Sequence, residues 1–528
     1  MSQAPIRTVV VLAAGEGKRM KSATPKVLHP LLGRTLVGHV LTAAATVGAA
    51  RTIVVVGHKA DEVRAHLAEI APEATPVLQA QQNGTGHAVR IALDAAPDVT
   101  GTVVVLNGDV PLLRPETVEA LVAAHEQGAV AATVLAAEVP DPTGLGRVVR
   151  DAGGRLERIV EERDATAEIR AIREINAGIY AFDLLLLREA LGKLSTDNDQ
   201  GEEYLTDVFG WLAAIGHPVA VHVAADARET LGCNDRAELA ALRALMRDRV
   251  NGAWMRSGVS ILDPATTWID VTVGLEPDAV IDQNSQLTGA TSVAAGATVG
   301  PDTTLVDTVV EAGATVVRTH AVGARVGPGA MVGPFSYLRP GTRLGAGSKV
   351  GGFVETKNAE LGERAKVPHL SYVGDATIGA RANIGAGTIF ANYDGVAKHH
   401  TTVGEAAFVG SDTVLIAPVQ VGPGAYVAAG SAIGQDVPAG ALGVTRAKEG
   451  TVPGWTARRR PGTVSAEAAE RAGAASGRAG AASGGAGAAS GGAGSGADAV
   501  AGAQADARGG EGSHDGPSAG GAPEGAGG

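Results

Sequence analysis

The sequence predicts an α/β domain, followed by a β-helix of hexapeptide repeats and then a disordered segment. Short β-branched runs alternate with helical stretches over the first 236 residues. An aliphatic residue then recurs every six residues, and the last part of the chain consists almost entirely of glycine, alanine and serine. A chain of 528 residues is also too long for one hydrophobic core, so we expect more than one domain.

Three apolar runs in the first part predict buried strands of a mainly parallel sheet. They are Thr8–Leu12, Thr52–Val56 and Thr102–Leu106, and all are rich in β-branched residues. The helical stretches between them favour a doubly wound domain over residues 1–236. A linking helix is expected over residues 237–257, because apolar residues recur there at intervals of three or four. These residues are Leu239, Leu242, Met246, Val250 and Trp254.

Two later runs of the chain repeat an aliphatic residue at every sixth position. The runs are Val326, Val332, Leu338, Leu344, Val350 and then Val403, Val409, Leu415, Val421, Val427, Ile433. An α-helix has a period of 3.6 and a half-buried strand a period of 2, so neither explains this pattern. A period of six is typical of a β-helix, in which each repeat supplies one face of a coil. We expect such a coil over residues 258–462, interrupted between Ile384 and Val403 by a turn at Asn392–Gly395.

Residues 463–528 are predicted to be a disordered tail. Val464 and Val500 are the only larger aliphatic residues in this stretch, and it has no aromatic residue. Such a segment cannot bury enough apolar surface to offset the entropy lost on ordering.

Charge and cysteine content exclude several functional classes. The formal net charge is −12, which argues against a nucleic-acid-binding protein, since phosphate neutralisation needs a basic surface. The single cysteine, Cys233, allows no internal disulfide and favours a reducing compartment. No apolar run is long enough to predict a signal peptide or a membrane span.

A glycine-rich loop follows the first predicted strand. Gly15 and Gly17 allow backbone N–H groups to approach an anion, while Arg19 and Lys26 add positive charge. The spacing of a Walker loop is absent. A tight strand–helix turn with no ligand explains the two glycines equally well.

An acidic residue follows the third predicted strand. Asp109 would lie at the carboxyl end of a parallel strand, where α/β sheets bind ligands. Its carboxylate is suited to hold Mg²⁺ together with substrate phosphates. A helix-capping or turn role is the alternative.

Three chemically reactive residues interrupt the apolar pattern of the predicted coil. Arg339 and Lys357 are cations, and His369 is a candidate general base. A positioned imidazole can remove the proton from an amine before acyl transfer. A lone histidine is more often structural, so spacing alone leaves the role of His369 open.

Together these motifs resemble those of the sugar-1-phosphate nucleotidyltransferases. More narrowly, they resemble the bacterial bifunctional N-acetylglucosamine-1-phosphate uridyltransferase / glucosamine-1-phosphate N-acetyltransferase family. The matching residues are Leu12–Arg19, Pro25-Lys26, Gln79, Gly84–His87, Gly108-Asp109, Gly144–Arg147, Glu161 and Asn176–Gly178. The resemblance covers about residues 5–457. It implies a Rossmann-like nucleotidyltransferase domain over residues 1–236 and a left-handed parallel β-helix acetyltransferase domain over 258–462.

For the first domain, the resemblance implies a uridyltransferase site that uses UTP and Mg²⁺. The implied site residues are Leu12, Ala13, Ala14, Gly15, Arg19, Lys26, Gln79, Gly84, Thr85, Asn107, Gly108, Asp109, Gly146, Glu161, Asn176 and Asn234. Among them, Asp109 and Asn234 are the implied metal ligands. Asn107 stands where the family often has tyrosine, so its contact with sugar or ribose departs from the pattern. Cys233 is expected to be a packed residue and not a nucleophile.

For the coil, the resemblance implies an acetyltransferase site with His369 as the general base. Arg339, Lys357, Tyr372 and Asn383 would bind the sugar phosphate. The implied acetyl-CoA-binding residues are Ala386, Asn392, Tyr393, Ser411, Ala429 and Arg446. Lys398, in the interrupting turn, is a candidate contact for a CoA phosphate.

The expected protein is a cytoplasmic, homotrimeric enzyme that makes UDP-N-acetylglucosamine. It would acetylate glucosamine 1-phosphate with acetyl-CoA and then transfer uridylyl from UTP, releasing diphosphate. Its partners would be these small molecules, with no nucleic acid and no membrane. One alternative is a nucleotidyltransferase whose coil is not catalytic, but such a coil does not need Arg339, Lys357 and His369. A non-enzymatic scaffold leaves the Gly15–Lys26 loop and Asp109 unexplained.

Overall fold

The computed structural model of the protein describes residues 6–447 and 449–483. The chain divides into two compact units after Arg446. The first unit holds the α/β domain, one long helix and the coil, and the described part of the second holds two helices.

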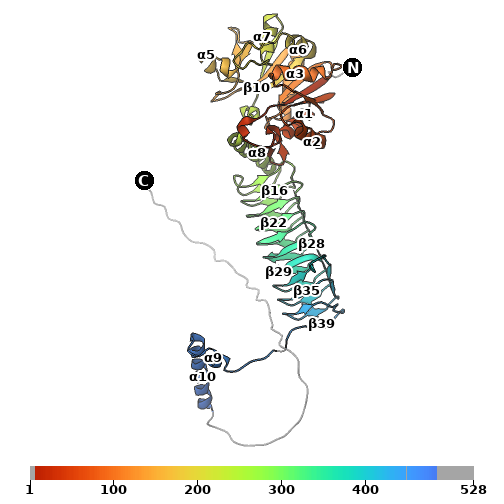
Figure 1. The fold of residues 1–528 in the computed structure, drawn as a ribbon, viewed down its shortest axis with the longest axis vertical. Coiled ribbons are helices and arrows are strands. Elements are labelled where there is room, and N and C mark those ends of the chain that lie inside the picture. Colours follow the sequence, from red (N-terminus) through yellow and green to blue (C-terminus); the bar gives the residue numbers. More distant parts are fainter. Residues whose placement is uncertain (1–5, 448, 484–528) are drawn as a thin grey trace, which may run out of the picture. The chain divides into compact units, whose positions relative to one another are not determined.

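A nine-stranded mixed sheet forms the centre of the α/β domain (Figure 1). Its strands are β1 (Arg7–Ala13), β4 (Arg51–Val56), β5 (Thr75–Leu78), β6 (Thr102–Asn107), β7 (Ala132–Glu138), β8 (Arg147–Arg150), β9 (Leu156–Val160), β10 (Glu174–Asp183) and β11 (Val219–Val223). The order is β11-β7-β10-β6-β1-β4-β5, and β8 pairs with both β10 and β9. The three predicted strands are confirmed as β1, β4 and β6, which are parallel neighbours. Strand β10 is antiparallel to β6 and β7. A separate hairpin consists of β2 (Pro30–Leu31) and β3 (Arg34–Thr35).

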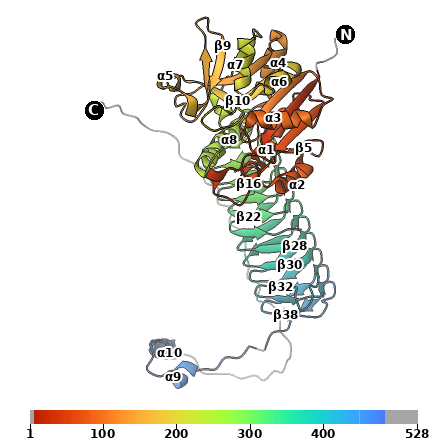
Figure 2. The same cartoon turned by 45° about the horizontal axis from the view of Figure 1, so that its top comes forward.

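Helices cover both faces of this sheet (Figure 2). They are α1 (Leu36–Ala45), α2 (Ala60–Ile70), α3 (Thr85–Asp94), α4 (Pro115–Gly128), α5 (Ala167–Arg170), α6 (Leu184–Leu191) and α7 (Asp207–Ala214), with short 3₁₀ turns at η1 (Lys18–Met20), η2 (Lys26–Leu28), η3 (Glu162–Asp164) and η4 (Ala227–Thr230). Successive strand residues point to opposite faces, so Val10 packs with α3, α6 and α7. Val9 and Val11 pack on the other face with α1, α2 and α4. The predicted doubly wound arrangement is therefore present.

The predicted linking helix is α8 (Arg236–Arg256), and it packs on both neighbouring parts of the first unit. Its N-cap is Asp235, whose carboxylate accepts hydrogen bonds from the N–H groups of the first turn. Leu239, Leu242 and Met246 are buried in a cluster with residues of the α/β domain. Val250 and Trp254 pack against the core of the coil. One apolar face thus serves two cores.

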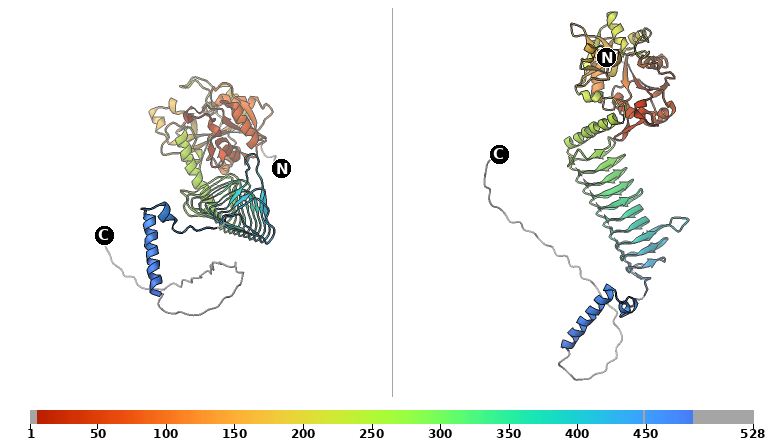
Figure 3. Two further views of the ribbon diagram at one scale, coloured as in Figure 1. Left: turned by 60° about the horizontal axis from the view of Figure 1, so that its bottom comes forward. Right: turned by 60° about the vertical axis from the view of Figure 1, so that its left-hand side comes forward.

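The coil is built from short parallel strands in two ladders (Figure 3). The eleven-stranded ladder contains β12 (Ser260–Ile261), β15 (Val280–Ile281), β18 (Thr298–Val299), β21 (Thr315–Val316), β24 (Met331–Val332), β27 (Lys349–Gly352), β29 (Lys366–His369), β31 (Asn383–Ile384), β34 (Phe408–Val409), β37 (Tyr426–Val427) and β39 (Leu442–Gly443). The seventeen-stranded ladder contains β13 (Trp268–Ile269), β14 (Gly274–Leu275), β16 (Gln286–Thr288), β17 (Ser292–Val293), β19 (Thr304–Val306), β20 (Val309–Val310), β22 (Thr319–Val322), β23 (Arg325–Val326), β25 (Ser336–Leu338), β26 (Arg343–Leu344), β28 (Glu355–Leu361), β30 (Tyr372–Ile378), β32 (Ile389–Ala391), β33 (Thr401–Val403), β35 (Val414–Ile416), β36 (Val419–Val421) and β38 (Ala432–Ile433).

The six-residue repeat forms the buried interior of this coil, which confirms the predicted β-helix. Every hexad residue named above is at most 4% exposed. The repeat extends one position further than the sequence suggested, because Phe390 is fully buried six residues after Ile384. The interruption is a loop that follows β32, in which Tyr393 and Lys398 form an antiparallel bridge. In Figure 3, right, a loop leaves the stack in the blue-cyan part of the coil.

The predicted tail lies in the second unit. This unit contains α9 (Trp455–Arg459) and α10 (Val464–Ser483), so the stretch expected to be disordered begins with a helix. Alanine is the strongest helix former, and the prediction considered buried surface without this local propensity. The Thr463 hydroxyl accepts a hydrogen bond from the backbone of Ala466, and Glu467 lies 3.9 Å from Arg471 one turn later. The predicted tail beyond residue 483 lies outside the described residues. Among the described helices, none combines the length and apolar character needed to cross a membrane.

Candidate active sites

A cavity of about 290 Å³ lies at the carboxyl ends of β1 and β6. This is the edge of a parallel sheet at which α/β proteins bind ligands. The predicted residues that line it are Leu12, Thr85, Asn107, Asp109, Gly146, Glu161, Asn176 and Asn234. The other predicted residues of this domain, which do not line it, are Ala13, Ala14, Gly15, Arg19, Lys26, Gln79, Gly84 and Gly108.

Lys26, Asp109 and Asn234 meet at one side of this cavity. The Lys26 ammonium forms an ion pair with Asp109 and donates a 2.9 Å hydrogen bond to the Asn234 side-chain oxygen. The side chains of Lys26 and Asp109 are only 14% and 21% exposed. The backbone N–H of Cys233 donates to the Asp109 carbonyl at 3.0 Å, which holds the Asn234 segment beside the strand end.

The oxygen atoms of Asp109 and Asn234 are suited to a hard divalent cation. One carboxylate and one amide oxygen fit Mg²⁺, which keeps several waters and takes further oxygens from phosphates. Among the described residues, no group of three or more His, Cys, Asp or Glu side chains could hold a metal. The described residues thus contain no metal site built from protein ligands alone. Asp109 and Asn234 instead fit a cation that is held jointly by the protein and by the substrate phosphates.

Gln79, Gly84 and Thr85 gather at a second side. The Gln79 amide donates to the Gly84 carbonyl at 3.1 Å, and Thr85 Oγ1 accepts from the Leu205 N–H at 3.0 Å. Gly84 has φ +107°, and a Cβ there would lie 2.4 Å from the carbonyl oxygen of Glu203. Only glycine fits this close approach of two backbone segments.

Gly146, Glu161 and Asn176 line another part of the cavity. The Asn176 N–H donates to the Gly146 carbonyl at 2.9 Å, and Thr206 Oγ1 donates to Glu161 at 3.2 Å. Burial raises the pKa of the Glu161 carboxyl, and the charges of neighbouring aspartates add to this effect. Asn107 rests against Gly178, where a Cβ would lie 2.1 Å from its amide nitrogen. The residue that departs from the family pattern thus packs against the Asn176–Gly178 bulge.

The remaining predicted residues near the loop divide into exposed and packed groups. Gly15 and Arg19 are exposed, and Arg19 has no side-chain partner among the described residues. Cys233 is fully buried, and burial raises the pKa of its thiol to about 11. A thiol with this pKa is protonated near neutral pH, which agrees with the expectation that Cys233 is not a nucleophile.

In the coil, hydrogen bonds between successive turns align several predicted acetyltransferase residues. The carbonyls of His369, Ala386 and Ser411 accept from the N–H groups of Gly387, Asp412 and Gly430, at 3.4, 2.8 and 2.8 Å. Each donor directly follows the next predicted residue along the column, namely Ala386, Ser411 and Ala429. His369, Ala386, Ser411 and Ala429 therefore occupy equivalent positions on consecutive turns. The Arg446 guanidinium donates to the Ala429 carbonyl at 3.3 Å and extends the column.

His369 ends β29 with its side chain exposed. No hydrogen bond or ion pair of its imidazole is found within the described residues. A general base needs such a free ring nitrogen.

Arg339, Lys357 and Tyr372 lie on the neighbouring ladder. Glu355 pairs with Tyr372 in the strand register and accepts a 2.9 Å hydrogen bond from Arg339. Lys357 lies 3.9 Å from the Asp375 carboxylate, which also accepts a hydrogen bond from Asn392. Asp375 thereby joins a predicted sugar-phosphate residue to a predicted acetyl-CoA residue.

Asp375 and Lys398 belong to this group in ways that the sequence interpretation missed. Burial alone would raise the pKa of Asp375, but hydrogen bonds from Asn358 and Asn392 and the charge of Lys357 lower it overall. The neighbouring Lys398 ammonium is the main cause that lowers the pKa of Lys357. The sequence offers Lys398 as a candidate contact for a CoA phosphate, and the structure places it beside Lys357. Asp375 is a charged residue of the coil that does not lie at a position of the six-residue repeat. This property could have identified it from the sequence as a candidate site residue.

Asn383 and Tyr393 make no side-chain contact with these groups among the interactions of the described residues, although Tyr393 forms a backbone bridge with Lys398. Asn383 begins β31 on the eleven-stranded ladder, away from the strands of Arg339, Lys357 and Tyr372. Tyr393 lies in the protruding loop, is 59% exposed and donates to the Gly395 carbonyl at 2.6 Å.

Comparison with known proteins assigns the chain to a family. The MobA-like NTP transferase domain matches residues 9–179. The bifunctional protein GlmU of Streptomyces coelicolor is 57% identical over 464 residues, which cover 88% of this chain and 96% of the relative. The chain belongs to the GlmU family. Bifunctional GlmU proteins of Thermobifida fusca (53% identity, 90% of this chain and 99% of the relative) and Kineococcus radiotolerans (55%, 88% and 94%) are similar over nearly their whole length.

Membership of the GlmU family confirms the predicted resemblance and function. The chain is a bifunctional enzyme of UDP-N-acetylglucosamine synthesis, with uridyltransferase and acetyltransferase activities. The alternative of a single-activity enzyme with a non-catalytic coil is disfavoured, because the GlmU relatives span the coil as well. A non-enzymatic scaffold is excluded on the same ground.

Proposed function

We propose that the two activities divide between the α/β domain of residues 1–236 and the coil of residues 258–462, with residues 237–257 as the linker. The observation that carries this division is the column of His369, Ala386, Ser411 and Ala429 on consecutive turns, beside the cations of the adjoining ladder. A coil that serves only for assembly has no need of an exposed, partnerless imidazole at such a position.

In the proposed acetyl transfer, the cations Arg339, Lys357 and Lys398 attract the phosphate of glucosamine 1-phosphate. His369 removes a proton from the sugar ammonium, which frees the nitrogen lone pair for attack on the thioester carbonyl of acetyl-CoA. The N–C bond forms and the C–S bond breaks, and the second proton lost by the nitrogen passes to the departing sulfur, so CoA leaves as the thiol. Ala386, Ser411, Ala429 and Arg446 line the proposed acetyl-CoA side, with Asn392 and Tyr393 in the adjoining loop.

In the proposed uridylyl transfer, an oxygen of N-acetylglucosamine 1-phosphate attacks the α-phosphate of UTP and diphosphate leaves. Lys26 and Arg19 neutralise charge that gathers on the phosphates, while Gly146, Glu161 and Asn176 hold the sugar. Gln79, Gly84 and Thr85 contact the uracil. We propose Mg²⁺ as the cofactor held by Asp109 and Asn234, and its chemistry is to neutralise phosphate charge.

A homotrimer is the proposed assembly. Its support is a column of apolar side chains that project from one corner of the coil. Phe335, Phe353 and Leu370 are 56%, 63% and 62% exposed, and the two phenylalanine rings stack at 5.2 Å. Further copies of the chain would cover this apolar surface. Light scattering of a Phe335→Ser/Phe353→Ser variant tests it, and an unchanged trimer mass would exclude this corner from the interface.

The proposed location is the cytoplasm. The support is Cys233, which is a buried free thiol and suits a reducing compartment. Detection of the native protein in the cytosolic fraction of its source cells tests this location.

A product assay tests the proposed reactions directly. The full chain receives glucosamine 1-phosphate, acetyl-CoA, UTP and Mg²⁺, with one component omitted at a time. We expect CoA release without UTP or Mg²⁺, and diphosphate release only when acetylation can precede it. Diphosphate release from glucosamine 1-phosphate without acetyl-CoA would contradict the proposed order.

A further inference from the structure

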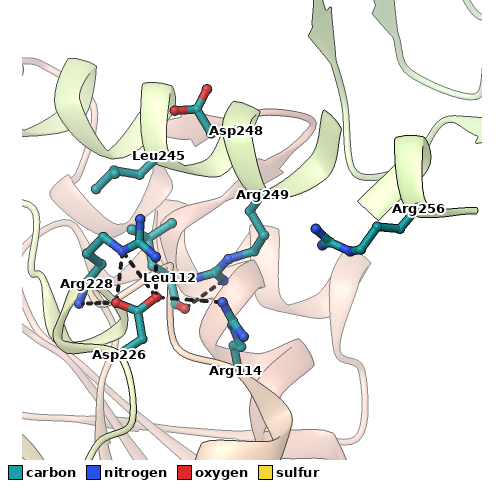
Figure 4. Close-up of a pocket in the computed structure, with 8 residues that line it drawn as sticks. All are labelled: Leu112, Arg114, Asp226, Arg228, Leu245, Asp248, Arg249 and Arg256. Carbon is teal, nitrogen blue, oxygen red and sulfur yellow. Dashed lines mark hydrogen bonds and ion pairs between the residues drawn. The ribbon is translucent and has the colours of Figure 1, made fainter. Parts of the chain in front are cut away.

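A second cavity lies under α8, away from both proposed active sites. Its volume is about 230 Å³, and its charged lining consists of Arg114, Asp226, Arg228, Asp248, Arg249 and Arg256. Figure 4 shows Arg249 descending from α8 toward Arg114, with Arg256 reaching in from the end of the helix. Positions 249 and 256 are two helical turns apart, so both side chains project from one face.

Two of the four guanidinium groups have carboxylate partners in this cavity. Arg228 makes hydrogen bonds with Asp226 at 2.9 and 3.1 Å. Arg114 lies 3.2 Å from the buried Glu229 carboxylate, although its buried Nε makes no hydrogen bond of good geometry. Asp248 is paired outside this group, with Arg247 at 2.7 Å.

The other two guanidinium groups lack an acidic partner among the described residues. Arg249 donates only to the carbonyl of Leu112, at 2.7 Å. Arg256 makes no hydrogen bond or ion pair with any described residue, and its guanidinium lies over Gly252. Burial and the charge of Arg114 lower the pKa of Arg249, and the charges of Glu229 and Asp226 offset only part of this effect. The cavity is therefore lined by two guanidinium groups, the partly buried Arg249 and the exposed Arg256, that no carboxylate of the described residues contacts directly.

We propose that this cavity binds a small phosphate-class oxyanion through Arg249 and Arg256, with Arg114 beside them. A dianion balances two cations, whereas a single carboxylate leaves one uncompensated. Guanidinium forks match pairs of phosphate oxygens, and the volume is below the ~300–1,000 Å³ of sites for larger ligands.

The position of the cavity gives the bound anion a route to the uridyltransferase site. Leu112 and Arg114 follow Asp109 on the same loop, and Asp226 and Arg228 precede Asn234 on another. An anion under α8 would hold together the two segments that carry the proposed metal ligands. The binding site itself does not depend on the proposed catalytic roles.

Calorimetric titration of the full chain with inorganic phosphate tests the site, and inorganic diphosphate in a parallel titration distinguishes the two sources of this chemistry. Arg256→Gln should weaken binding of at least one probe on the order of tenfold, since charge-assisted hydrogen bonds are lost. The matched control is Arg343→Gln, which removes an exposed arginine that likewise has no partner among the described residues.

The unmodified chain, Arg256→Gln and Arg343→Gln all retain anion binding at the two active sites. Only the difference in affinity between Arg256→Gln and the other two proteins therefore reports on this cavity. Folding of Arg256→Gln is checked by its melting temperature and its acetyl-transfer rate, which should equal those of the unmodified chain. Arg256→Lys should retain part of the affinity, because the charge stays while the fork is lost. Equal binding by Arg256→Gln and the unmodified chain, or no phosphate or diphosphate binding that depends on Arg256, would overturn the proposal.

Discussion

The Lys26 ammonium donates a 2.9 Å hydrogen bond to the side-chain oxygen of Asn234, a residue 208 positions later in the chain. The same ammonium pairs with Asp109, so a single cation lies between two oxygen donors. This arrangement shows that the strand ends of the α/β domain form a site for positive charge. It also ties the glycine-rich loop of residues 15–26 to the proposed metal ligands.

Asp109→Ala should cripple Mg²⁺-dependent diphosphate release while acetyl transfer persists. Loss of one charge-stabilising group costs about 10²–10³-fold in rate in comparable sites. The measurement is diphosphate release from UTP and N-acetylglucosamine 1-phosphate, with CoA release as the internal control. Equal loss of both activities would indicate misfolding and not a local role.

His369→Ala should abolish acetyl transfer and leave uridylyl transfer unchanged. General-base catalysis contributes about 10²–10⁴-fold, and the exposed imidazole has no partner among residues 6–447 and 449–483 whose loss would unfold the coil. A CoA-release assay measures the effect. His400→Ala, in the adjacent loop, serves as the matched histidine control and should retain activity. Normal acetyl transfer in His369→Ala would rule out the assignment.

Lys398→Ala should raise the KM for glucosamine 1-phosphate more than that for acetyl-CoA. Lys357 and Lys398 repel each other, and a phosphate between them relieves this repulsion. The change in KM should be several-fold, on the order of one charge-assisted contact, with little change in kcat. Lys193→Ala, an exposed lysine of the α/β domain, is the control. A rise confined to the KM for acetyl-CoA would return Lys398 to the CoA phosphate, as the sequence first suggested.

Glu161→Gln should stabilise the protein at neutral pH while it weakens sugar binding. Burial raises the folded-state pKa of Glu161, so the ionised carboxylate destabilises the folded state. This cost is present above the folded pKa and vanishes below the ordinary pKa of glutamate. The gain in melting temperature should therefore shrink as pH falls from 8 toward about 4.5. Glu157→Gln, on the surface, should show no such trend, and a gain that is constant with pH would contradict the explanation.

Truncation after Gly462 should leave both activities intact. The removed segment holds α10 and the residues beyond it, and none of the proposed site residues lies there. Both rates are measured against the full chain in the same product assay. A large drop in either rate would assign the tail a part in that reaction.

Local patterns made several elements predictable. The β-branched runs at β1, β4 and β6 and the periodic face of α8 depend on near neighbours in the chain, and the structure has them within a residue or two of the expected bounds. Over α10 the structure has a helix at the start of the predicted tail, because alanine favours a helix without any core to bury. Phe390 was missed as a hexad residue, since an aromatic side chain stands there instead of the repeated aliphatic.

The contacts of Lys26 with Asp109 and Asn234, and the column of residues on consecutive turns of the coil, depend on residues that are distant in the sequence. No spacing rule could place Asn234 on Lys26, or Lys398 beside Lys357 through the loop that follows β32. The arginine cavity under α8 is likewise assembled from three separate segments. That two of its guanidinium groups have no acidic partner within the described part of the chain becomes visible only from the folded structure.

By itself, the sequence determined the alternation of strands and helices, the six-residue coil and the family to which the chain belongs. These properties follow from the periodicity of apolar residues and from the order of the motifs, both of which can be read from the sequence alone. Only the tertiary structure decided which charged groups face one another. That outcome depends on the packing of α8 on two cores and on the register between successive turns, because electrostatic and hydrogen-bond energies fall steeply with distance and no local pattern encodes it.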